Sequence, residues 1–154
     1  MSDTRTKEIY EMLCSALDAR EWRYNRIDEK NAVFYGVNTE DLPMEFTIAV
    51  EGESVRLFSA LTTKFDEDKR MDGCIATNFA NSKLADGCFD FDLSNGSILF
   101  RMNHSLRGGC IPNNDFFYYI IDFASFAVDE YNDRFLALSK GYVSIQDFLT
   151  KADN

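Results

Sequence analysis

The sequence predicts an α+β protein with two layers, an antiparallel sheet of about five strands and the helices packed against it. The expected order of elements along the chain is α-β-β-β-α-β-β-α. Apolar residues recur at helical spacing in three long stretches, and they alternate with polar residues in shorter ones. Tight turns join neighbouring strands, and the strand–helix–strand repeat that builds a parallel sheet is missing. We expect the whole chain, residues 1–154, to form a single domain, because its length is ordinary for one domain.

The first half of the chain predicts one helix and a three-stranded meander. Residues Thr4–Arg20 have the apolar periodicity of an amphipathic helix, and Trp22–Ile27 follows as a short extended segment. Strands are then expected at Ala32–Val37, Met44–Val50 and Val55–Thr62, where apolar residues largely alternate with polar ones. A tight turn at Glu51-Gly52-Glu53 joins the last two strands into a hairpin.

A second helix is expected at Asp66–Asn81, with Met71, Ile75 and Phe79 as its apolar stripe. Gly73 lies inside this helix, where glycine costs about 1 kcal/mol relative to alanine. Its presence indicates either a soft helix or a position that another backbone approaches closely. The stripe predicts which side of the helix faces the core.

A second hairpin and two further helices complete the predicted fold. The hairpin joins Cys88–Leu93 to Ser97–Ser105 through Ser94-Asn95-Gly96, since Asn-Gly is a strong signal for a tight turn. A third helix begins at Pro112 and runs to Leu138, and Ser144 caps a short final helix. The third helix is apolar over much of its circumference, so we expect it to be covered on more than one side. Its main apolar face is predicted to contain Phe116, Ile120, Phe123, Ala127 and Tyr131.

The charge of the chain disfavours several classes of partner. The formal net charge is −10 and basic residues form no isolated patch, so nucleic acid and anionic membrane surfaces are not expected partners. The longest apolar stretch, residues 116–128, is too short to span a bilayer and contains Asp122. The first residues are polar and lead directly into a helical pattern, unlike a signal peptide. We therefore expect a cytoplasmic protein.

Neither a metal site nor a cofactor site is expected from the residue patterns. The cysteines, Cys14, Cys74, Cys88 and Cys110, are widely spaced, which favours free thiols over a two-disulfide framework or a zinc site. His104 is the sole histidine, and it is expected to hydrogen-bond near a strand end rather than to act in catalysis.

Motifs for calcium, phosphate and acyl-transfer chemistry also fail to match. The segment from Asp90 to Arg101 begins like a calcium loop, but it lacks the glycine at the sixth position and the glutamate at the twelfth. Gly108-Gly109 lacks the further glycines and the lysine of a phosphate-binding loop, and no GxSxG elbow occurs. No catalytic residue is predicted, and we expect a protein that is not an enzyme.

Three large apolar residues are predicted on the sheet face opposite the core: Phe34, Phe58 and Leu99. If helices cover one side of the sheet, these side chains face outwards, and aromatic residues on an outer face often mark a binding surface. The alternative is that a helix or a second subunit covers them. A shift of one residue in strand register would also reverse this assignment.

One group of residues resembles the YbjN family of bacterial proteins. The group lies between Asn81 and Arg101: Asn81, Leu84, Gly87, Phe89, Asp92, Gly96, Ile98, Phe100 and Arg101. The resemblance extends over most of the chain and implies the fold of type III secretion chaperones. It further implies a homodimer that binds extended protein segments, with a role in sensory or stress regulation.

Judged by residue type alone, these positions are expected to have structural roles. Asn81 is expected to hydrogen-bond the chain near the end of the second helix, and Gly87 to adopt backbone angles that other residues avoid. Arg101 is expected to pair with Asp90 or Asp92 across the hairpin.

The sequence therefore predicts a non-enzymatic protein-binding module of chaperone-like or regulatory type, with an unidentified protein partner. The alternative is a small-ligand receptor, or an enzyme, with an apolar pocket of an unrecognised kind.

Overall fold

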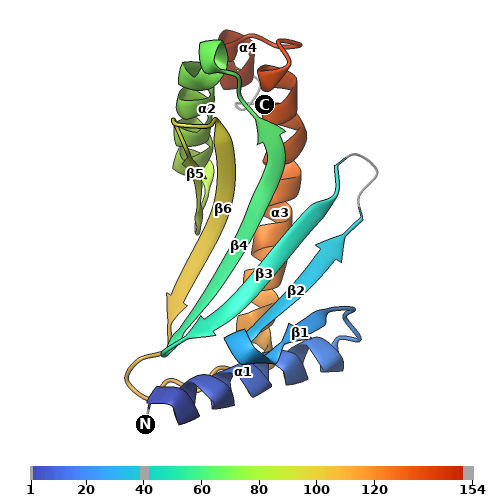
Figure 1. Ribbon diagram of the computed structural model, residues 1–154, viewed down its shortest axis with the longest axis vertical. Helices are drawn as coiled ribbons and strands as arrows, with labels where there is room; N and C mark the ends of the chain where they lie inside the picture. The colour runs from blue at the N-terminus through green and yellow to red at the C-terminus, as the bar shows by residue number, and fades with distance from the viewer. Residues whose placement is uncertain (1, 39–41, 151–154) are drawn as a thin grey trace.

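The computed structural model describes residues 2–38 and 42–150, and it confirms the predicted α+β class. Helices pack against one antiparallel sheet, whose strands lie in the order β1-β2-β3-β4-β6-β5 (Figure 1). The elements along the chain are α1 (Ser2–Ala19), β1 (Asn25–Ile27), a 3-10 turn (Asp28–Lys30), β2 (Ala32–Val37), β3 (Met44–Glu51), β4 (Ser54–Lys64), a second 3-10 turn (Glu67–Lys69), α2 (Arg70–Lys83), β5 (Cys88–Phe91), β6 (Ser97–Ser105), α3 (Asn114–Ser139) and α4 (Ile145–Thr150).

The described sheet has six strands, one more than the sequence indicated. The additional strand is β1, which is the end of the segment predicted to be merely extended, and it pairs with residues 32–34 of β2. Asn31 closes this hairpin with a φ of 48°, in the left-handed region that asparagine tolerates better than most residues. Three residues of pairing give a weak periodic signal, so the strand is visible only once its partner is in place.

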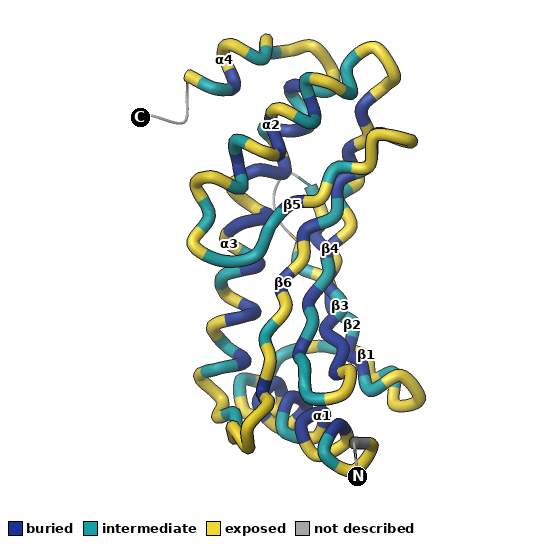
Figure 2. The backbone as a smooth tube through the Cα atoms, turned by 90° about the vertical axis from the view of Figure 1, so that its left-hand side faces the viewer, coloured by how far each residue is buried: buried dark blue, intermediate teal, exposed yellow. Residues whose placement is uncertain are grey.

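Helix α3 is the main helix of the helical layer. It runs along one side of the sheet, and Figure 2 shows the sheet beside it in edge view. The Asn113 side chain accepts a hydrogen bond from the Phe116 amide at 3.0 Å and caps its start, one residue after Pro112. The helix packs against β4, α1, α2 and α4, so the expectation that it is covered on more than one side is confirmed.

The predicted core face of α2 was wrong. Met71 and Ile75 are exposed, at 67% and 44%, while the small residues on the opposite side are buried. The reason is steric, because a Cβ atom on Gly73 would lie 2.5 Å from Phe91 Cε2. A helix this close to the rings of β5 must present small residues to them. The buried set is Gly73, Ala76, Thr77 and Ala80.

Three of the residues on which the family resemblance rests have structural roles. The Asn81 side chain accepts from the Phe89 amide at 2.7 Å and donates to the Phe89 carbonyl at 3.0 Å. It therefore satisfies the outer edge of β5 as a neighbouring strand would. Gly87 has a φ of 67°, and Arg101 pairs with Asp90 across the hairpin, as predicted.

Free thiols are spread over the molecule. Cys14 is buried, Cys74 and Cys88 are half-buried, and Cys110 is exposed, and all four are free. In the part of the chain that the structure describes, no helix has the length and apolar character needed to cross a bilayer.

Tyr35 carries a buried hydroxyl without a partner among the described residues. Its ring stacks on Phe46 at a centroid distance of 5.2 Å, and the side chain is 1% exposed. We expect Tyr35→Phe to raise the free energy of unfolding by about 1 kcal/mol in urea denaturation at pH 7, because an unpaired buried hydroxyl is removed. Tyr10→Phe is the control and should lower stability, since the Tyr10 hydroxyl donates to Asp28 at 2.7 Å.

The same substitution should change how the free energy of unfolding depends on pH. Burial raises the pKa of Tyr35 in the folded protein. Above about pH 10, the unfolded chain therefore loses this proton before the folded chain does, and stability falls as the pH rises. Tyr35→Phe should show a smaller loss between pH 9 and roughly pH 11. An unchanged pH profile would contradict the assignment.

Candidate protein-binding surface

The three apolar residues singled out from the sequence lie together on one face of the sheet. Phe34 is opposite Thr47, and Thr47 is opposite Phe58, so the two rings sit in one row across β2, β3 and β4. Phe58 is in turn opposite Arg101, two residues from Leu99 on β6. Leu99 is thus a diagonal neighbour of Phe58, at a spacing of about 7–8 Å between backbones. We call Phe34, Phe58 and Leu99 the sheet-face band.

The sheet-face band points away from the helical layer. The neighbours of these residues along each strand, Tyr35, Leu57 and Phe100, are buried in the core, and successive side chains of a strand alternate between faces. All three band residues are half-buried, and among residues 2–38 and 42–150 no helix lies over them. Figure 1 looks onto this face, with α3 behind the sheet.

Two charged groups beside the band form ion pairs within the molecule. The Arg56 guanidinium lies 2.8 Å from Glu51 and stacks over the Phe58 ring at 5.0 Å. Arg101 pairs with Asp90, whose hydrogen bond raises the pKa of the arginine. Such exposed pairs add little stability. Their effect here is that the two arginines beside the band are each neutralised by a carboxylate.

A hollow of about 720 Å³ extends the band towards the end of the sheet. It lies where the register between β4 and β6 shifts between Ala60 and Lys64, which interrupts the regular pairing of the two strands. Leu99 belongs to both the band and the hollow. The lining is largely apolar and includes Ala60, Leu61, Phe91, Leu93, Ile98 and Leu99.

His104 lies on the opposite, helix-covered side, away from the sheet-face band. Its Nε2 atom lies 3.0 Å from an Asp86 oxygen, and that oxygen accepts a hydrogen bond from the Tyr119 hydroxyl at 3.0 Å. Burial and this hydrogen bond raise the pKa of Tyr119. His104 does lie near the end of β6, but its Nε2 atom has no hydrogen-bond partner among the described residues, so the predicted hydrogen bond is not shown. In the described part of the chain, no group of three or more His, Cys, Asp or Glu residues is placed to hold a metal ion.

Sequence reasoning missed the exposed aromatic residues of α3. Phe126 is 62% exposed and Tyr119 is 46% exposed. Phe116 and Phe123 were assigned to the core face, yet both are only half-buried. The available signal was the spacing of these four residues, which repeats at three, four and three positions.

The architecture is that of the two-layer, type III secretion chaperone-like class: one antiparallel sheet with helices on one side and, as far as the described residues extend, an open face on the other. A YbjN-like arrangement within this class is supported by comparison with solved structures. The crystal structure of YbjN from E. coli, described there as a candidate transcription regulator, matches with a TM-score of 0.58 and 11% identity, over 80% of this chain and 91% of that one.

A second match has the same architecture. The structure of the ExsC–ExsE complex matches with a TM-score of 0.51 and 12% identity, over 87% of this chain and 95% of the matched chain. Identities this low establish the fold alone. No protein-family model and no curated protein matches the sequence.

Proposed function

We propose that this chain is a non-enzymatic protein-binding module of chaperone-like or regulatory type. The sheet-face band is the observation that carries the proposal, because Phe34, Phe58 and Leu99 form an apolar surface that the described helices leave open. Apolar side chains gathered on an outer face are a common mark of a binding surface. The ExsC–ExsE match adds support, since a protein of the same fold was solved as a complex.

An extended apolar segment suits this surface better than a folded domain does. The band crosses about 10 Å of sheet between the strands of Phe34 and Phe58, and it continues through Leu99 into the hollow at the register shift. A narrow path of this kind accepts alternate side chains of an extended chain. The paired charges of Arg56 and Arg101 then form a polar rim.

The small-ligand alternative has less support. A receptor of that kind usually offers a concave site with a few convergent polar groups. The hollow beside Leu99 and a groove of about 630 Å³ between α1 and the start of α3 are both open to solvent. The groove has an apolar floor that includes Met12 and Phe117.

Affinity capture with surface variants tests the proposal. Wild-type protein should retain a defined set of proteins from a bacterial lysate, and the double variant Phe58→Ser/Leu99→Ser should retain at least tenfold less, because loss of two apolar anchors costs about 1.4 kcal/mol or more. Tyr142→Ser is the matched control, since Tyr142 is 78% exposed and lies off the band. Equal capture by the double variant would count against the band.

The finer expectations from the family resemblance belong to the same proposal. We expect a bacterial, cytoplasmic protein whose residues 1–154 form one domain. We further expect that it acts as a homodimer in sensory or stress regulation. Light scattering should then give a mass twice the 17.7 kDa of one chain. A monomer at micromolar concentration would remove the homodimer from the proposal.

A further inference from the structure

A stripe of aromatic residues runs along α3 from the ring of His104 on β6 to the exposed Phe126. Phe116, Tyr119, Phe123 and Phe126 follow one another at spacings of three, four and three residues. This is the spacing of the apolar seam in paired helices. The stripe spans about 15 Å of helix, since each residue adds about 1.5 Å. We call these four residues the helix stripe.

The stripe is held in a fixed shape by neighbouring groups. Phe116 and Tyr119 both contact the His104 ring edge-on, at centroid distances of 5.9 and 6.2 Å. Tyr119 also packs on Phe123 at 5.8 Å, while its hydroxyl donates to Asp86. Phe126, at 62% exposed, continues the stripe beyond this cluster. An ordered aromatic surface loses little conformational entropy when a partner covers it.

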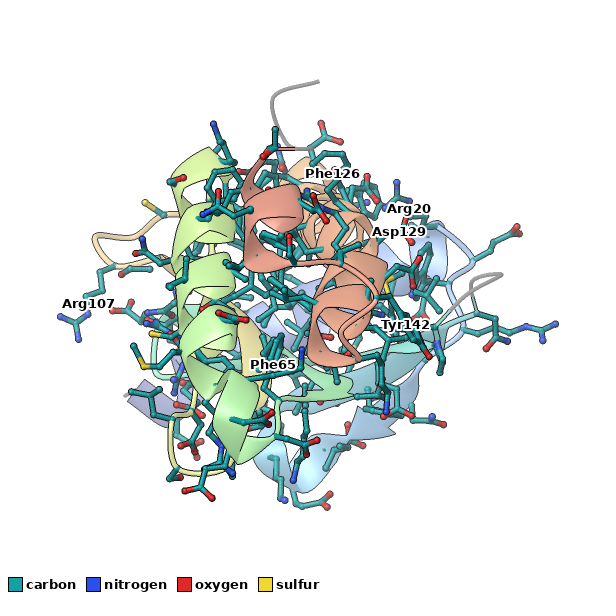
Figure 3. All side chains as sticks on the ribbon, turned by 90° about the horizontal axis from the view of Figure 1, so that it is seen from above. Arg20, Phe65, Arg107, Phe126, Asp129 and Tyr142 are labelled. Atoms are coloured by element: carbon teal, nitrogen blue, oxygen red, sulfur yellow. The ribbon has the colours of Figure 1, made fainter. Side chains whose placement is uncertain are left out.

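A row of acidic residues borders the stripe on one side. Asp115, Asp122 and Asp129 recur at intervals of seven residues, and all three are exposed. Arg20 neutralises Asp122 through two hydrogen bonds of 2.8 Å. Asp115 and Asp129 have no basic partner among the described residues. Seen from above in Figure 3, Phe126 and Asp129 project from the side of α3 that faces away from the sheet.

We propose that the helix stripe binds an amphipathic helix of a partner protein whose apolar face is flanked by lysine or arginine. The three-four-three spacing fits the ridges of a second helix, and two unpaired carboxylates beside the stripe attract basic flanking residues. The surface is separate from the sheet-face band, because the two lie on opposite sides of the sheet. The inference therefore does not rest on the proposed function of that band.

Charge argues against a second copy of this chain as the occupant. In an antiparallel self-pairing, the row of Asp115, Asp122 and Asp129 would face its own copy, and like charges at these flanking positions disfavour pairing. A net charge of −10 adds general repulsion between copies. A basic helix meets neither penalty.

Fluorescence anisotropy with a designed peptide tests this proposal. The probe is a labelled peptide of about 20 residues, with leucine at both seam positions and lysine beside them. The matched peptide carries glutamate in place of lysine. We expect the lysine peptide to bind the full-length protein, and the glutamate peptide to bind at least tenfold more weakly.

Variants then distinguish binding of the peptide at the helix stripe from nonspecific electrostatic attraction to the protein. Phe126→Ser and the double variant Asp115→Asn/Asp129→Asn should each weaken binding of the lysine peptide at least tenfold, and the double variant should also reduce its dependence on salt. The sheet-face variant Phe58→Ser should bind the peptide like wild type. This control distinguishes failure here from failure of the proposed function.

Results of three kinds would overturn the proposal. The first is the absence of binding, and the second is equal binding of both peptides or binding that Phe126→Ser leaves unchanged. The third is a wild-type dimer that Phe126→Ser converts to a monomer in light scattering, which would show that a second copy occupies the stripe.

Discussion

Phe135→Ala is expected to lower the free energy of unfolding by about 3–5 kcal/mol, the usual cost of truncating a buried phenylalanine. Phe135 is fully buried and joins three parts of the fold. Its ring meets Phe89 of β5 edge-on at 5.1 Å and stacks on Phe148 of α4 at 5.8 Å. The truncation would therefore open a cavity where sheet, long helix and final helix converge. Urea denaturation followed by circular dichroism measures the loss.

Phe126→Ala is the matched control for this prediction, because it makes the same chemical change on the same helix at an exposed position. Its effect on unfolding should stay within about 0.5 kcal/mol. Since whole domains are stable by only about 5–15 kcal/mol, Phe135→Ala removes a large share. A loss below roughly 1 kcal/mol for Phe135→Ala would show that this aromatic cluster does not hold the helices to the sheet.

Gly96→Ala should lower the free energy of unfolding by about 2–5 kcal/mol, from backbone strain and overpacking together. Gly96 has a φ of 75°, in the left-handed region that penalises side chains. An added Cβ atom would overlap the carbonyl oxygen of Phe65 and lie 3.0 Å from the Phe65 nitrogen. The Phe65 amide also donates to the Gly96 carbonyl at 2.9 Å, so the turn is fixed against this segment.

Gly108→Ala separates the two contributions, because Gly108 has a similar φ of 82° with nothing within 4 Å of an added Cβ atom. It should cost about 1–2 kcal/mol, the backbone strain alone. Thermal or urea unfolding of the two variants, side by side, gives the difference. Equal losses would mean that the turn can move away from Phe65 without penalty.

The strands and their faces could be predicted because alternation is a local signal. Met44–Val50 alternates cleanly, and its hairpin with β4 fixes which residues face outwards. Phe34, Phe58 and Leu99 therefore lie on the predicted face. The order of strands in the sheet needs contacts between distant residues, such as those of β4 with β6, and periodicity within one strand contains no such information.

The helices show that the apolar side of a helix is not always the side buried in the core. Met71 and Ile75 looked like the buried side of α2, but the close approach of Phe65 and Phe91 to Gly73 selects the side with small residues. For α3, the apolar circumference correctly predicted several neighbours. It could not say which aromatic residues stay exposed, because that depends on where the sheet and α1 end.

The candidate site was thus only partly visible in the sequence. The sheet-face band follows from strand alternation, whereas the hollow beside Leu99 depends on a register shift between two strands distant in the chain. The helix stripe has a sequence signal in its spacing, but its exposure emerges only from the packed structure.

Site-specific photo-crosslinking from the sheet-face band tests the central claim most directly. Benzoylphenylalanine in place of Thr47 would sit between Phe34 and Phe58, and the same group in place of Tyr142 serves as the control. Position 47 should yield crosslinks to a partner protein that mass spectrometry maps to one short apolar segment. Crosslinks from position 142 alone, or none from position 47 in a lysate where the partner is retained, would contradict binding at this face.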